Sequence, residues 1–260
     1  MSKETTAKDD EEALEETTLL SHLIELRSRL LKIALAVVLV FVALVPWSRD
    51  IFSLVSEPLR EVLPGNAMIA TAVASPLLTP FKLTFFVALF IAMPIVLYQV
   101  WAFVAPGLYK KEKNFAMPLL ASSIALFYLG IAFAYYVVFP LIFGFFTAVA
   151  PDGVEVQTDI SLFLDFITTI VFAFGLAFEV PIATVLIVWT GLTTPKKLSK
   201  ARPYVFLGAF VVGMFLTPPD VISQTLLAVP VYLLYELGIL MAKIFARKEE
   251  ETGEDTKPAE

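Results

Sequence analysis

The sequence predicts an all-α membrane protein with six transmembrane helices, the last two of them short. Hydrophobic residues make up 58% of the chain and charged residues only 17%, whereas a soluble domain is nearer half apolar and a quarter charged. Several long stretches carry no charge, and about 20 mostly apolar residues let a helix cross roughly 30 Å of hydrocarbon. A single 28.7 kDa globule could not bury this much apolar surface, so most of the chain is expected to lie in lipid.

The membrane domain is predicted to cover residues 19–245. Its third uncharged stretch, 114–151, is too long for one span, so we expect that span to end near Pro140 and an amphipathic piece to follow on the far side. The fifth stretch is shorter than a bilayer requires. The predicted spans are about 30–47, 83–105, 115–139, 160–190, 203–217 and 220–242.

The two ends of the chain differ from its middle. Residues 1–18 and 246–260 are polar, acidic and poor in aromatic residues. Such segments cannot bury enough apolar area to offset the entropy of ordering, which predicts a disordered acidic tail at each end. The acidic start, with no small-residue cleavage site after the first apolar run, also argues against a cleavable signal peptide.

The distribution of Lys and Arg predicts which side of the membrane holds the termini. Six spans put both tails and the loops at 106–114 and 191–202 on one side, which carries 16 of the 19 basic residues. Basic residues are in excess on the cytoplasmic side of membrane proteins, so both termini are predicted to be cytoplasmic. On the opposite side, the amphipathic run 51–62 predicts a short helix at the outer interface.

Cysteine labelling tests this topology, because the native chain has no cysteine. Single cysteines replacing Asn66 and Gly153 should react with an impermeant thiol reagent added to intact spheroplasts, whereas those replacing Asn114 and Ser199 should not. Labelling at position 114 from outside would contradict the six-span arrangement.

Glu179 is the most informative polar residue within a span. It lies about 19 residues, or roughly 28 Å of helix, from the outer start of the fourth span, with Pro181 two residues further on. A lone acid at such depth costs about 2.5–3.5 kcal/mol even on insertion scales. It must be protonated, face water or meet polar groups. A wet helix interface would tolerate it, but an intramembrane acid more often indicates a functional site.

Two cytoplasmic acids lie within basic runs and have two interpretations each. Glu25 precedes Arg29 by four residues, the favourable order for a helical ion pair. Glu112 lies between Lys111 and Lys113, which screen it. Alternatively, a carboxylate at the membrane surface could bind a ligand that carries arginine.

The remaining polar residues of the spans have simpler interpretations. Glu236 and Asp165 lie near span ends, where their carboxylates can reach water. Thr217, Gln224 and Gln99 are suited to hydrogen bonds between helices.

Several classes of function are excluded by what the sequence lacks. With no cysteine and one histidine, it cannot build a thiolate or multi-histidine metal site. It has no phosphate-binding glycine-rich loop and no nucleophile elbow, so we expect no catalytic residue, cofactor or nucleic-acid partner. Two alternatives remain: a proton-coupled small-solute transporter with Glu179 as carrier, and an intramembrane hydrolase. The first lacks an internal repeat, and the second lacks catalytic residues.

Six short motifs occur in order along the chain and together resemble one family. They are Ser21–Arg27, Ala74–Pro76, Tyr98–Pro106, Phe178–Pro181, Lys200–Tyr204 and Leu216–Asp220. This set is similar to the TatC family, the polytopic receptor subunits of the twin-arginine protein translocase. The resemblance covers about residues 19–243, which is all but the acidic tails.

The resemblance implies a fold, a function and a set of partners. The six helices would form a curved, glove-like wall in the inner membrane of a bacterium. The chain would bind Arg-Arg signal peptides of folded precursors at the cytoplasmic face. With the single-span subunits TatB and TatA it would export these precursors, driven by the proton-motive force, and self-association in a multimeric receptor complex is expected.

The resemblance also implies roles for individual residues. Glu25, Glu112 and Phe103 match the signal-binding patch of the family, and Glu179 matches its intramembrane acid. The implied partner-docking patch contains Thr217 and Gln224, and Pro58 lies in the outer loop used for assembly.

Overall fold

The computed structural model describes residues 2–62, 68–104, 113–149, 157–216 and 221–254. Regular structure in these ranges is helical, apart from one isolated parallel bridge between Ile69 and Asp159, which confirms the all-α prediction. The elements are α1 (Ser2–Leu44), η1 (Val45–Trp47), α2 (Ser48–Val62), α3 (Ser75–Val104), α4 (Lys113–Phe133), η4 (Ala134–Val138), α5 (Phe139–Val149), α6 (Ile160–Ala177), α7 (Val180–Trp189), α8 (Pro195–Lys200), α9 (Arg202–Leu216) and α10 (Val221–Glu254).

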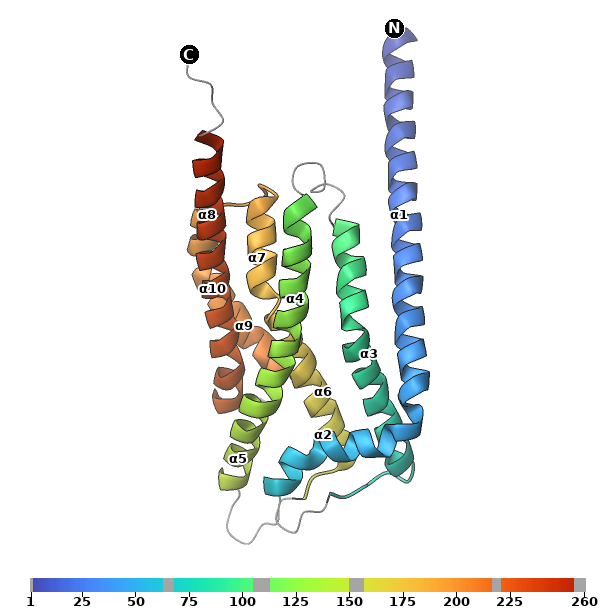
Figure 1. Cartoon of the computed structure of the whole chain (residues 1–260), viewed down its shortest axis with the longest axis vertical. Coiled ribbons are helices and arrows are strands. Elements are labelled where there is room, and N and C mark those ends of the chain that lie inside the picture. The colour runs from blue at the N-terminus through green and yellow to red at the C-terminus, as the bar shows by residue number, and fades with distance from the viewer. Residues whose placement is uncertain (1, 63–67, 105–112, 150–156, 217–220, 255–260) are drawn as a thin grey trace.

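Five helical stretches are long and apolar enough to cross a membrane. They lie in α1, in α3, in the run from α4 to α5, in the run from α6 to α7, and in α10; α9 is a sixth, shorter apolar helix of 15 residues. Figure 1 shows the two termini at the same end of the molecule. The prediction that the last two helices are both short holds for α9 only, because the apolar stretch of α10 covers the 24 residues Val221–Ile244.

The third membrane stretch continues as helix past Pro140, the residue near which the span is predicted to leave the membrane. α4 passes through the π-helical turn η4 into α5, and the apolar stretch runs from Met117 to Val149. In this turn the Phe139 N–H donates to the Ala134 carbonyl five residues back. Pro140 follows directly and has no N–H to donate. A widened turn next to it accommodates the ring and the missing bond, so the helix bends without stopping.

Both terminal helices extend into the segments whose composition predicts disordered tails. α1 begins at Ser2, and α10 continues to Glu254. These segments hold ten Glu, four Lys and four Ala, residue types with high helix propensity. The same composition that prevents a buried core therefore favours local helix as an extension of the adjoining span.

The amphipathic run after the first span forms the predicted helix. α2 follows the 3₁₀ turn η1, which contains Pro46. Figure 1 shows α2 lying crosswise to α1 at the end of the molecule opposite the termini. The Tyr135 hydroxyl donates to the Leu54 carbonyl over 3.2 Å, which ties α2 to η4.

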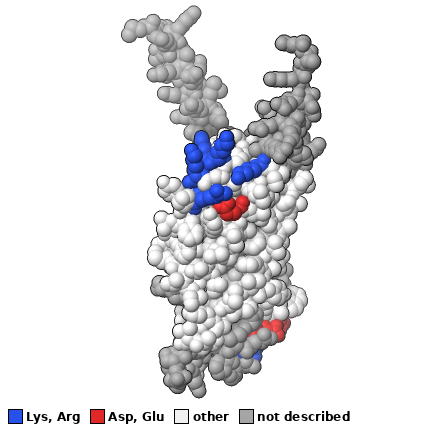
Figure 2. All heavy atoms as spheres, turned by 90° about the vertical axis from the view of Figure 1, so that its left-hand side faces the viewer, with Lys and Arg blue, Asp and Glu red and all other residues white. Residues whose placement is uncertain are grey.

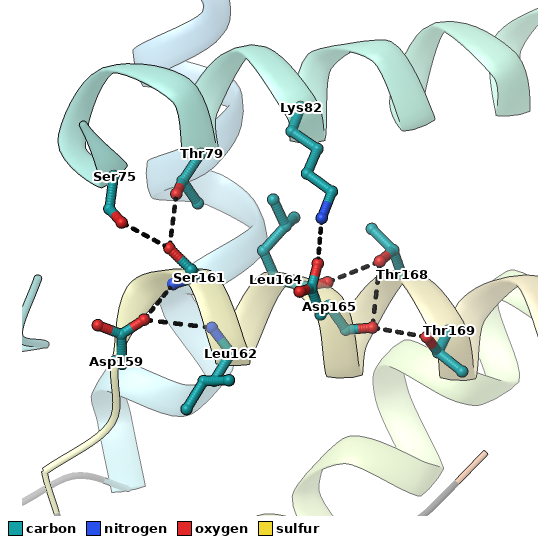
Figure 3. A network of polar contacts seen from close by, with 10 residues as sticks. All are labelled: Ser75, Thr79, Lys82, Asp159, Ser161, Leu162, Leu164, Asp165, Thr168 and Thr169. Carbon is teal, nitrogen blue, oxygen red and sulfur yellow. Dashed lines mark hydrogen bonds and ion pairs between the residues drawn. The ribbon is translucent and has the colours of Figure 1, made fainter. Parts of the chain in front are cut away.

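A polar network fixes the end of the molecule opposite the termini (Figure 3). Asp159 caps α6 by accepting from the Ser161 and Leu162 N–H groups, and its other oxygen accepts from the Thr71 N–H (2.8 Å) and hydroxyl (2.6 Å). The bonds from Thr71 and from the α6 backbone lower the pKa of Asp159 to about 2. The Ser161 hydroxyl lies 2.8 Å from that of Ser75 at the start of α3. The carboxylate thus joins the segment before α3 to the start of α6.

The apolar core lies where η4 and α5 meet α6 and α10. Its members are buried aromatic and aliphatic side chains, and the rings of Phe133 and Phe174 are 5.4 Å apart between centroids. Gly130 lets α4 approach α6 closely, because a Cβ there would lie 2.5 Å from the Phe174 carbonyl oxygen. Gly238 does the same for α10 and α7, where a Cβ would overlap the Thr184 hydroxyl and lie 3.0 Å from the Pro181 Cα.

Candidate functional site

Glu25 belongs to a polar cluster between α1 and α3. Arg29 lies one turn further along α1, and its Nε donates to Glu25 Oε1 over 3.0 Å while its Nη2 pairs with the same oxygen. The guanidinium also donates to Gln99 Oε1 (3.3 Å) and to the Ala102 carbonyl (2.9 Å) of α3. The predicted i,i+4 ion pair and the predicted helix–helix role of Gln99 are both confirmed.

This cluster leaves part of the Glu25 carboxylate open. The Glu25 side chain is 38% exposed, against 20% for Arg29, and both bonds from Arg29 to Glu25 end on Oε1. Oε2 is therefore not used by Arg29. Phe103 follows the contacted Ala102 in α3 and is partly buried. Glu112, the second predicted signal-binding acid, lies outside the described residues.

Glu179 lies at a break between two helices within the fourth membrane stretch. α6 ends at Ala177 and α7 begins at Val180, with Pro181 in its first turn. The Glu179 N–H donates to the Leu176 carbonyl three residues back, which tightens the chain at this point. Figure 1 shows α6 and α7 running in different directions on either side of the break. A proline with no N–H explains why the helix is interrupted here.

The Glu179 side chain points toward α4. The buried Ser123 hydroxyl donates to Glu179 Oε2 over 2.6 Å. The other oxygen, Oε1, is buried and has no hydrogen-bond partner among the described residues. An unsatisfied buried oxygen of this kind costs about 1–3 kcal/mol. Sequence reasoning located the acid but not Ser123, since a serine in an apolar helix carries no distinguishing signal.

Gln224 bonds within the chain. Its side-chain nitrogen donates to the Phe210 carbonyl of α9 over 3.2 Å, which confirms the predicted bond between helices. Gln224 also packs against Gly213, where a Cβ would lie 3.3 Å from the glutamine side chain. Thr217 lies outside the described residues. Pro58 is part of α2, but its side chain is also outside the described part of the chain.

Glu236 has a partner that the sequence did not predict. Arg202 Nε and Nη2 donate to its two oxygens over 2.6 and 2.8 Å, and the Tyr232 hydroxyl donates over 2.9 Å. The two parallel bonds between the Arg202 guanidinium and the Glu236 carboxylate join the start of α9 to α10. The spacing of the two residues could have predicted this ion pair. Arg202 lies 14 residues before the end of α9, and Glu236 lies 15 residues after the start of α10. The two arms of a helical hairpin bring such residues to the same depth.

Basic side chains gather at the end of the molecule that carries the termini. Figure 2 shows a group of Lys and Arg side chains there, beside an acidic one. Lys196, Lys197 and Lys200 belong to α8, and Arg202 begins α9. The predicted topology assigns 16 of the 19 basic residues to the side that carries the termini, and the position of this group agrees with that assignment.

Comparison with known proteins decides the family. The profile described as "Sec-independent protein translocase protein (TatC)" matches residues 21–230. The chain belongs to the TatC family. It is thus a component of a Sec-independent protein translocase and a multi-pass membrane protein.

Individual TatC relatives match almost the whole chain. The protein from Azotobacter chroococcum is 57% identical over 251 residues, which cover 96% of this chain and 98% of the relative. The protein from Escherichia coli K12 is 57% identical over 88% of this chain and 90% of the relative. A crystal structure of the twin-arginine translocase receptor TatC is 35% identical, covers 86% of this chain and 98% of that one, and has a TM-score of 0.77.

Proposed function

We propose that this chain is the core receptor subunit of the twin-arginine translocase in a bacterial inner membrane. It binds Arg-Arg signal peptides at the cytoplasmic face and, with TatB and TatA, exports folded precursors using the proton-motive force. The observation that carries the proposal is the partly exposed carboxylate of Glu25, which Arg29 holds through Oε1. An anchored acid suits recognition of a guanidinium, because its orientation is set before the ligand arrives.

Recognition by two acids would favour arginine over lysine. The planar guanidinium can bind a carboxylate through two parallel bonds, which an ammonium cannot. Glu112 supplies the second carboxylate in this proposal, and Phe103 supplies an apolar surface beside Glu25. Both termini are cytoplasmic in this arrangement, which places the cluster of α1 and α3 on the side where precursors are made.

A deletion strain tests the assignment. Expressing this chain in bacteria that lack their own TatC should restore export of precursors with an Arg-Arg signal, and a photo-crosslinker at position 103 should capture such a precursor in isolated membranes. Export by the Sec route serves as the control, because it should not change. Restored growth with no restored export of Arg-Arg precursors would contradict the proposal.

Glu179 is proposed as a contact for a partner helix within the membrane. α9 has 15 residues, or about 22 Å of helix, which is shorter than the roughly 30 Å of hydrocarbon. A short span thins the bilayer nearby and lets water reach deeper. Once the Glu179 side chain turns outward, Oε1, which has no partner among the described residues, can accept from a polar side chain of a single-span subunit. Gln224, Thr217 and the outer-loop Pro58 are proposed to support assembly around this contact.

Glu179→Ala should leave the protein folded and precursor binding intact, while crosslinking to the single-span partner and export both fall. Folding should survive because the substitution removes a buried oxygen that has no partner. Glu179→Gln should be milder, since its amide oxygen can still accept from Ser123. Ser123→Ala should weaken partner crosslinking in part, because it releases the carboxylate. A photo-crosslinker at position 179 that captures only lipid, with partner and precursor present, would contradict this role.

A further inference from the structure

An apolar groove opens between α6 and α9 and continues to α7 and α10. Its volume is about 750 Å³, and its walls include Phe86, Ala173, Val180, Gly208, Val212 and Leu227. Thr168 and Thr169 also line it, but their hydroxyls donate to carbonyls of their own helix (Figure 3). The groove therefore offers an occupant almost no hydrogen bonds, which suits a hydrocarbon chain.

The groove has the length of one leaflet. It runs along the fourth membrane stretch from Thr168 to Val180, which is 12 residues or roughly 18 Å of helix. Half of the hydrocarbon layer measures about 15 Å. The Thr168 end lies toward the start of α6, at the end of the molecule opposite the termini (Figure 1). An acyl chain that enters beside Thr168 would therefore run from that side of the membrane toward its middle.

An ion pair between Lys82 and Asp165 lies near the Thr168 end of the groove. Lys82 of α3 lies four residues before Phe86, and Asp165 of α6 lies three residues before Thr168, so each is about one turn from a groove residue. Figure 3 shows the Lys82 ammonium reaching across to Asp165. The two side chains are 53% and 55% exposed. An ammonium has three donors and a carboxylate has about four acceptor sites. The described bond between Lys82 and Asp165 therefore leaves each group able to form further hydrogen bonds.

We propose that the groove and this ion pair bind one phospholipid of the leaflet opposite the termini, with a phosphoethanolamine headgroup. An acyl chain fills the groove, the Lys82 ammonium donates to the phosphate, and Asp165 accepts from the ethanolamine ammonium. A zwitterionic headgroup complements both members of the pair. A purely anionic headgroup such as phosphoglycerol would pair with Lys82 but meet repulsion from Asp165.

Lipid retention after purification tests the headgroup part of the proposal. Protein purified from membranes that contain equal phosphatidylethanolamine and phosphatidylglycerol should retain the former in excess, measured by native mass spectrometry. Asp165→Asn should abolish this preference while phosphatidylglycerol stays bound, because Lys82 remains. Lys82→Gln should lower retention of both lipids, roughly tenfold for one lost charge-assisted bond. Both substitutions break the same ion pair, so equal effects of the two would show a structural bridge only and overturn the proposal.

A groove-filling substitution tests the acyl part. A Cβ at Gly208 meets nothing within 4 Å, and the same is true at Gly144 of α5, which is outside the groove. Gly208→Leu should therefore reduce retention of phosphatidylethanolamine, whereas Gly144→Leu should not. A photo-crosslinker at position 212 should capture lipid in membranes. Capture of a protein helix alone at that position, or equal retention by the two leucine variants, would overturn the proposal.

Discussion

Replacing Glu25 and Glu112 together by glutamine should lower the affinity for a twin-arginine precursor by roughly a hundredfold or more. Each charge-assisted hydrogen bond contributes about 1.5–3 kcal/mol when partly desolvated, and two are lost. Each single substitution should have an intermediate effect. Changing Arg-Arg to Lys-Lys in the precursor should have a similar result, because lysine cannot form the bidentate contact. The measurement is binding of a labelled precursor to membranes with equal amounts of each variant.

Two controls separate recognition from structure. Asp50→Asn together with Glu57→Gln removes two carboxylates from α2, at the opposite end of the molecule, and should leave binding unchanged. Arg29→Gln removes the links to Gln99 and Ala102 but keeps the Glu25 carboxylate. If Arg29→Gln reduced binding as much as Glu25→Gln, the tie between α1 and α3 would account for the effect. Normal precursor binding by the double glutamine variant would mean that Glu25 and Glu112 face water and take no part in recognising the signal peptide.

Gly130→Ala should destabilise the protein strongly, although alanine is the better helix former. Its Cβ would lie 2.5 Å from the Phe174 carbonyl oxygen and 3.0 Å from the Phe174 carbonyl carbon. These are backbone atoms, so no side-chain rotation relieves the overlap. Overpacking costs about 1–3 kcal/mol, which exceeds the gain of about 1 kcal/mol in helix propensity. The thermal midpoint in detergent, followed by size-exclusion chromatography with fluorescence detection, should fall.

Gly208→Ala is the matched control for this substitution. Gly208 is also within an apolar helix, and a Cβ there meets nothing within 4 Å. Only the gain in helix propensity applies to Gly208→Ala, so its thermal midpoint should stay constant or rise. A fall of equal size in both variants would mean that loss of glycine flexibility, and not the approach of α4 to α6, sets the cost at Gly130.

Local patterns determined which segments form helices and where the acidic groups lie along them. Uncharged stretches gave the membrane helices because backbone groups in lipid must bond within their own segment. The spacing of Glu25 and Arg29 predicted their ion pair, since residues four apart are neighbours on a helix. The amphipathic run after the first span predicted α2 for the same reason. These features depend on contacts a few residues apart, which a sequence displays directly.

Contacts between helices were decided only by the tertiary structure. Arg29 bonds to Gln99 and Ala102, which are 70 and 73 residues away in sequence, and the bond between Glu179 and Ser123 joins the break between α6 and α7 to α4. The π turn before Pro140 keeps the helix continuous past this proline. Each of these depends on the rotation and approach of helices, which are set by packing at places such as Gly130 and Gly238. Such packing follows side-chain shape in three dimensions, so hydropathy along the chain does not specify it.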